Sequence, residues 1–166
     1  MVLGMTLETY TLVHVLISLV AIGSGFVAMF GLLSGKRLNA WTAVFLSTTV
    51  ATSVTGFGFP FHELLPPHKV GIVSLVVLAV AILARYPLRL AGAWRRVYVV
   101  CAALALYLNV FVLVVQSFQK VSFLKAMAPK QTEAPFVVAQ GAVLVLFVVL
   151  GTLAAIRFRA EPVRAT

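Results

Sequence analysis

Five long apolar runs, separated by short segments that carry nearly all of the charge, are the feature that most constrains the fold of this 166-residue chain. A helix needs ~20 apolar residues to cross the hydrocarbon core of a bilayer. Each run reaches or approaches that length. The sequence therefore predicts an all-α membrane protein, a bundle of five transmembrane helices forming one domain over residues 1–166, with spans at about 10–33, 40–61, 67–84, 97–119 and 135–156.

The composition supports a membrane protein and argues against most enzyme classes. Hydrophobic residues make up 62% of the chain and charged residues 10%, more apolar surface than a soluble domain of this size could bury. Cys101 is the single cysteine, so an intramolecular disulfide and C-x-x-C motifs are excluded. The sequence contains no aspartate, no H-E-x-x-H motif and no phosphate-binding glycine loop. A non-enzymatic protein is the favoured class.

The distribution of basic residues predicts the orientation in the membrane. Nine of the 13 lysines and arginines follow the first, third and fifth runs, and four lie in the connections on the other side. Because positive loops stay in the cytoplasm, we expect an outer amino terminus and a cytoplasmic carboxyl terminus. The net charge of +9 then reflects contact with the anionic inner leaflet, and nucleic acid is not an expected partner.

The third run and two connections differ from the other long apolar runs. The third run is the shortest, and it is bracketed by Lys69 and Arg85, whose side chains we expect to snorkel toward the interface. A re-entrant third segment, leaving four spans, is the alternative. Residues 85–96 should lie on the inner leaflet as a lipid anchor, and 121–134 should contain a short interfacial helix.

All three histidines map to the predicted outer end of the bundle. His14 lies about one turn inside the first span, where an ionisable residue needs a partner or a function. His62 and Glu63 follow Gly56, Gly58 and Pro60 in the hairpin between the second and third spans. His68 should fall in the first turn of the third helix, where the helix dipole favours the neutral imidazole that a metal or haem iron requires. The competing interpretation is a hydrogen-bonded polar cap and water-exposed loop histidines.

Other polar residues share this outer layer or line the second span. Gln116 and Gln140 should lie at a depth similar to that of His14, as interhelical hydrogen-bonding groups. Thr48, Thr52 and Thr55 share one helical face, which either packs against neighbours or lines a narrow polar path. Small residues at helical spacing predict the closest contacts of the first span, namely Ala21, Ser24, Gly25 and Ala28.

Two stretches, TTVATSVTGFGFPFH and LALYLNVFVLVVQSF, resemble the small, uncharacterised multi-span proteins of the proteobacterial inner membrane, a resemblance that implies location but no assigned function. The leading functional hypothesis is an accessory or binding subunit that acts through its histidine-containing outer face, with a membrane-protein partner or a second copy. The rival is a redox protein in which His14 and His68, or His62, hold haem b or a divalent metal. A small-solute permease is the weaker alternative.

Overall fold

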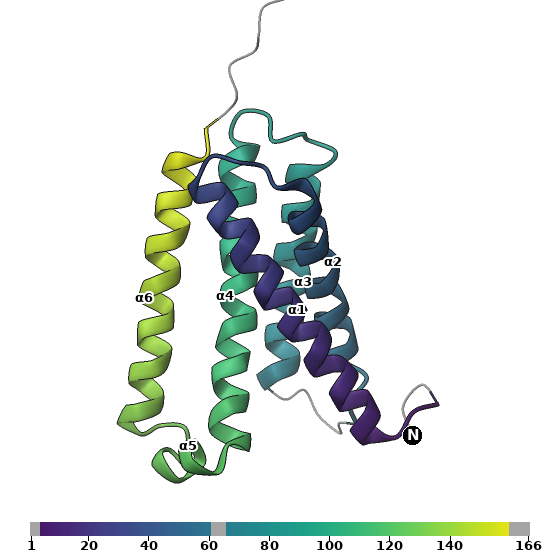
Figure 1. Ribbon diagram of the computed structural model, residues 1–166, viewed down its shortest axis with the longest axis vertical. Helices are drawn as coiled ribbons and strands as arrows, with labels where there is room; N and C mark the ends of the chain where they lie inside the picture. Colours follow the sequence, from purple (N-terminus) through teal and green to yellow (C-terminus); the bar gives the residue numbers. More distant parts are fainter. Residues whose placement is uncertain (1–3, 61–65, 160–166) are drawn as a thin grey trace, which may run out of the picture.

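The computed structural model describes residues 4–60 and 66–159 as α-helices joined by short connections (Figure 1). Within this part of the chain there are six helices: α1 (Leu7–Leu33), α2 (Asn39–Gly56), α3 (Pro66–Arg85), α4 (Trp94–Lys120), α5 (Ser122–Met127) and α6 (Ala134–Arg157). The long helices run between two ends. One end carries the amino terminus and is called here the histidine end. The other carries the α1–α2 and α3–α4 connections and is called the arginine end.

Four of the described helices, α1, α3, α4 and α6, are long and apolar enough to cross a membrane. The chain is therefore a small multi-pass integral membrane protein. Helix α2 is 18 residues long and less apolar, because seven of its residues are serine or threonine. It nevertheless runs beside α1 and α3 between the same two ends of the bundle (Figure 1).

The expected helices are all present, and their bounds agree with the apolar runs to within three residues except at one place. Helix α2 ends at Gly56 instead of continuing to 61. The N–H groups of Phe57 and Gly58 donate to the carbonyls of Val54 and Thr55, so the chain tightens into turns there. Pro60 follows, and a proline has no N–H with which to continue the helical pattern. The sequence around 56–60 already carried this signal.

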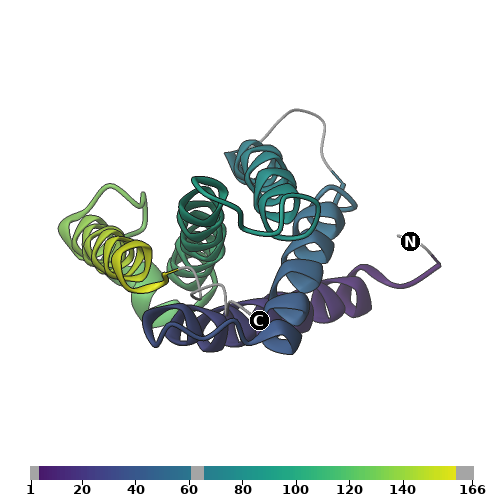
Figure 2. The same ribbon diagram turned by 90° about the horizontal axis from the view of Figure 1, so that it is seen from above.

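Helix α4 is central, with α3 and α6 on either side of it, and α1 crosses the bundle obliquely (Figure 2). The packing depends on small residues. Ala21, Ser24, Gly25 and Ala28 of α1 are all buried, as expected. A Cβ built on Gly25 would lie 2.5 Å from Leu106 Cδ1 of α4 and 2.8 Å from Phe45 Cδ2 of α2. Glycine is therefore what lets α1 approach both helices at this point.

The side chain of Arg85 differs from the sequence expectation. It does not snorkel outward but is buried, with 8% of its surface exposed. Its Nη2 donates to the carbonyl of Arg37 at 3.0 Å and to Asn39 Oδ1 at 2.7 Å. The guanidinium also lies over the ring of Tyr98. These acceptors and the aromatic face hold the cation inside the α2–α3–α4 contact, which explains why it does not extend to the surface.

The connection between α4 and α6 contains the expected short helix, α5. Its Phe123 is the most exposed large hydrophobic residue in the described part of the chain, at 71%. At the far side of the connection, the carboxylate of Glu133 accepts from the N–H groups of Lys130 and Thr132, at 3.2 and 3.0 Å. These bonds fold the backbone directly before α6.

Candidate functional site

His14 lies in the contact between α1 and α2. Its Nδ1 is 2.8 Å from Thr55 Oγ1, and its ring meets the ring of Phe59 edge-on, with centroids 5.2 Å apart. Thr55 Oγ1 also donates to the carbonyl of Ala51. When the Thr55 hydroxyl proton is used in the bond to Ala51, Nδ1 of His14 is the donor toward Thr55 Oγ1. The imidazole is then held in one orientation. The geometry is that of a hydrogen-bonded polar group between helices.

Tyr10 extends this cluster by one helical turn toward the amino terminus. Its hydroxyl donates to the carbonyl of Thr55 at 2.7 Å, and its ring packs against Phe59 at 5.1 Å. A Cβ on Gly58 would lie 2.0 Å from the Tyr10 hydroxyl oxygen, so only glycine fits there. Tyr10, His14, Thr55 and Phe59 together are called here the α1–α2 cap. The Tyr10 hydroxyl thus adds a second hydrogen bond to the Thr55 carbonyl, which already accepts from the N–H of Gly58 at the end of α2.

His68 is the third residue of α3, in the first turn, as predicted. Its side chain is buried, and its ring lies 5.7 Å from that of Phe57. A Cβ on Gly71, one turn further along α3, would lie 3.2 Å from the same phenylalanine ring. Phe57 and Phe59 therefore fasten the end of α2 to different helices, the first to α3 and the second to α1.

The glutamines of the expected polar layer lie in other contacts. Gln140 Nε2 donates to the carbonyl of Phe111 at 3.1 Å, which joins α6 to α4. Its Oε1 is buried with no hydrogen-bond partner among the described residues. Gln116 is partly buried on α4. The amino-terminal part of α1 diverges from α6 (Figure 1), so Gln140 is not brought to the α1–α2 cap. The oblique path of α1 is the physical reason.

The hydroxyl-rich face of α2 is used mainly for packing. Thr48 and Thr49 donate to the carbonyls of Val44 and Phe45, four residues earlier. Asn109 Nδ2 of α4 donates to Thr49 Oγ1 at 3.2 Å, so the Asn109 side chain faces α2. Ser53 of α2 and Ser74 of α3 are 3.1 Å apart. Such bonds support a packing role for this face of α2 rather than a narrow polar path along it.

Two of the candidate residues, His62 and Glu63, lie outside the described residues. Within residues 4–60 and 66–159, three or more histidine, cysteine or acidic side chains do not gather anywhere in a form that could hold a metal ion. His14 of α1 bonds to Thr55 of α2, whereas His68 of α3 packs against Phe57. A ligand role for His14, His62 or His68 therefore stays a prediction.

A groove lies between α4 and α6 at the arginine end, and the sequence did not predict it. It encloses about 920 Å³ and is lined mainly by apolar side chains, with Arg95, Arg96 and Arg159 at one end. The arginines were visible in the sequence, but as signals of orientation. The groove itself depends on the distance and rotation of two helices, which no local pattern contains.

Comparisons of this chain with family models, with curated proteins and with solved structures each find no match.

Proposed function

We propose that the chain is a five-span protein of a bacterial inner membrane, with an outer amino terminus and a cytoplasmic carboxyl terminus. Helix α2, 18 residues long, would span about 27 Å at 1.5 Å per residue. Its hydroxyl groups bond mostly to its own carbonyls, which lowers the cost of a span that contains so many serines and threonines. The described arginines cluster at one end, which supports the orientation.

A topology experiment tests this proposal directly. A reporter fused after Arg159 should behave as cytoplasmic, and a reporter inserted at position 62 should behave as periplasmic. A fusion after Lys36 checks the number of spans, because it separates α1 from α2 and should also be cytoplasmic. Periplasmic activity of the Arg159 fusion would overturn the orientation.

For function, we propose a non-enzymatic accessory or binding subunit that acts through the histidine end. The observation that carries this proposal is the double anchoring of the end of α2. Phe59 packs against Tyr10 and His14 of α1, and Phe57 packs against His68 of α3. Phe59 before residues 61–65 and His68 after them are thus both packed against neighbouring helices. Rigid helices support recognition sites better than loops do, so these packed flanking residues support a binding role at the histidine end.

The redox alternative makes a different demand on the same residues. His14 and His68, or His62, would have to present free imidazole nitrogens to one iron or metal ion. The Nδ1 atom of His14 is already 2.8 Å from Thr55 Oγ1. A hydrogen bond at one ring nitrogen is compatible with ligation through the other, since such bonds commonly orient metal-bound histidines. The alternative is therefore decided by spectroscopy and not by this contact.

The experiment has two parts. First, an absorption spectrum and metal analysis of the detergent-purified protein should show no haem band and no stoichiometric metal. A haem band that His14→Ala removes would establish the redox alternative. Second, a photo-crosslinking residue at position 62 should give a discrete adduct in intact cells. The matched control is the same residue at Val145, on the exposed surface of α6. Equal adduct patterns at both positions would refute a binding role for the histidine end.

A further inference from the structure

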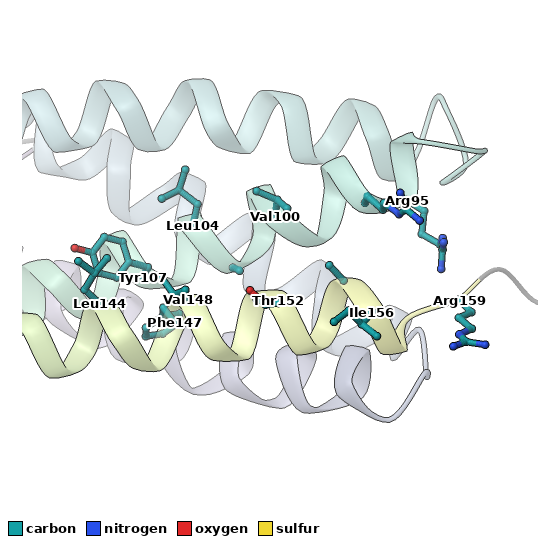
Figure 3. Close-up of a pocket in the computed structure, with 14 residues that line it drawn as sticks. Arg95, Val100, Leu104, Tyr107, Leu144, Phe147, Val148, Thr152, Ile156 and Arg159 are labelled. Atoms are coloured by element: carbon teal, nitrogen blue, oxygen red, sulfur yellow. The ribbon is translucent and has the colours of Figure 1, made fainter.

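The groove between α4 and α6 is apolar along its length and basic at one end (Figure 3). Arg95 and Arg159 lie together at the arginine end, and Tyr107 and Leu144 lie at the other. Val100 and Leu104 of α4 face Val148 and Ile156 of α6 along it. Among the residues that line the groove, none is acidic. An occupant should therefore be a long apolar molecule with a negative charge at one end.

The floor of the groove is closed by tight helix packing. A Cβ on Gly151 of α6 would lie 3.3 Å from the Cβ of Ala103 of α4, so the two helices approach closely there. Phe147 is buried against Phe26 of α1 and Tyr107 of α4, with ring centroids 5.9 and 5.8 Å apart. Helix α1 thus covers the back, and the opening faces outward from the bundle, toward lipid.

The position of Arg95 shows that the basic end is organised. Its Nη1 donates to the carbonyl of Phe158, directly after α6 ends, and Phe158 itself is buried. This contact fastens the end of α6 to the start of α4. It also fixes one guanidinium at the mouth of the groove, whereas Arg96 and Arg159 are exposed beside it. Guanidinium groups bind phosphate oxygens well because they present paired donors.

The length of the groove fits one leaflet. From Arg95 to Tyr107, α4 rises about 18 Å at 1.5 Å per residue. Half of a bilayer core of ~30 Å is about 15 Å, so the apolar part matches the acyl chain of a single lipid. A partner helix would instead use the full span. A second copy related by a two-fold axis along the membrane normal would bring its own Arg95, Arg96 and Arg159 against these, which like-charge repulsion disfavours.

We propose that the α4–α6 groove is a binding site for an anionic phospholipid, with its phosphate at Arg95, Arg96 and Arg159 and one acyl chain along the groove toward Tyr107 and Leu144. The basic end is the end that the proposed topology places in the cytoplasm, where anionic headgroups are abundant. The site is separate from the histidine end, and its binding can be measured whether or not the histidine end binds a partner.

Native mass spectrometry of the full chain in detergent tests the site by titration with phosphatidylglycerol and with phosphatidylcholine of the same acyl chains. The wild type should bind phosphatidylglycerol at least about tenfold more tightly. The double variant Arg96→Gln/Arg159→Gln should weaken that binding roughly 10- to 30-fold, since each basic group near an anionic lipid contributes about a fivefold factor. The control Arg37→Gln/Arg89→Gln removes the same charge at the same end outside the groove, and should change binding less than about twofold.

A second pair of variants tests the apolar part of the groove, where the acyl chain would lie. Val148→Trp fills the groove and should weaken phosphatidylglycerol binding at least about fivefold, whereas Val149→Trp, on the adjacent exposed position that does not line the groove, should leave it unchanged. Unchanged helical circular dichroism and elution volume establish that each variant is folded. Equal losses in the two arginine double variants would overturn the proposal in favour of general charge attraction. If glycerol phosphate competes for the groove as well as phosphatidylglycerol does, the groove binds small anions and the lipid proposal is wrong. If the delipidated protein forms a dimer that crosslinks across the groove, the occupant of the groove is a second copy of this chain and not a lipid.

Discussion

The guanidinium carbon of Arg85 lies 5.1 Å from the centre of the Tyr98 ring, at the arginine end of the bundle. Tyr98 is fully buried, and Arg85 is nearly so. Among the described residues no carboxylate pairs with this cation, and Arg85 Nη2 donates instead to a backbone carbonyl and to the Asn39 side chain. A buried charge is tolerated only when such groups replace its hydration. Arg85 therefore joins the α1–α2 connection to α3 and α4.

Removing the acceptor of this cation should destabilise the bundle. Asn39→Ala leaves Arg85 with one fewer acceptor in a buried site, and we expect a loss of about 1–3 kcal/mol in the free energy of unfolding. Arg85→Lys should cost a similar amount, because an ammonium cannot reproduce the planar stacking on Tyr98. SDS titration in mixed micelles measures both. Lys36→Ala, in the same connection and exposed, is the control and should stay within about 0.5 kcal/mol of wild type; an equal loss there would contradict the assignment.

A pair of glycines in α1 separates helix packing from helix propensity. Gly25→Ala places a methyl group 2.5 Å from Leu106 Cδ1, and overpacking of this kind typically costs about 1–3 kcal/mol. Gly23→Ala, two residues earlier, meets nothing within 4 Å and should be neutral or slightly stabilising. Thermal unfolding in detergent compares them. If both variants unfold at the wild-type temperature, α1 does not approach α2 and α4 as described.

Glycines at the end of α2 offer a second matched comparison. Gly58→Ala would collide with the Tyr10 hydroxyl and break its bond to the carbonyl of Thr55, with an expected loss of about 1–3 kcal/mol. Gly56→Ala places its methyl 3.9 Å from His14 Cε1, an ordinary contact, and should change stability little. Tyr10→Phe should partly rescue Gly58→Ala, because it removes the hydroxyl oxygen, the nearer of the two Tyr10 atoms that collide, and leaves Cζ at 2.8 Å. An additive double variant would argue against the contact.

The bond between His14 and Thr55 can be measured by a double-mutant cycle. His14→Ala and Thr55→Val should show a coupling free energy of about 0.5–1.5 kcal/mol, the range for a hydrogen bond inside a protein. Thr48 bonds to the carbonyl four residues before it in the same way as Thr55, but it lies about two helical turns away from Thr55 along α2. The cycle of His14→Ala with Thr48→Val should therefore give a coupling near zero, and equal coupling in both cycles would exclude a specific pair.

The connection before α6 should loosen in acid. Desolvation alone would raise the pKa of Glu133, but the backbone N–H groups of Glu133, Lys130 and Thr132, together with the charge of Lys130, hold that pKa below its ordinary value. A lowered pKa means that the ionised form stabilises the folded connection above the ordinary pKa, and that this contribution is lost as pH falls through the folded value. Amide exchange at Lys130 and Thr132 should lose protection in acid, and Glu133→Gln should remove this pH dependence. If Glu133→Gln leaves the protection of these two amides at neutral pH unchanged, the Glu133 carboxylate does not hold the connection.

Sequence alone determined where the helices of this protein lie. The bounds followed from local composition because a helix in a bilayer satisfies its backbone bonds within its own segment, so each apolar run specifies its own structure. The first turn of α3, containing His68, and the early end of α2 near Gly56 and Pro60 also had local signals, although the apolar run itself continues beyond Gly56.

Only the tertiary structure decided which polar groups meet. Depth along each helix was readable from the sequence, and it placed His14 and Gln140 at similar levels. Their partners depend on rotation and crossing angle, which the close packing of Gly25 against Leu106 and Phe45 sets across helices far apart in sequence. For that reason His14 meets Thr55 while Gln140 meets the carbonyl of Phe111. The same non-local packing turns Arg85 inward and opens the groove beside Arg95, because side chains within reach of buried acceptors bond there instead of extending to the membrane surface.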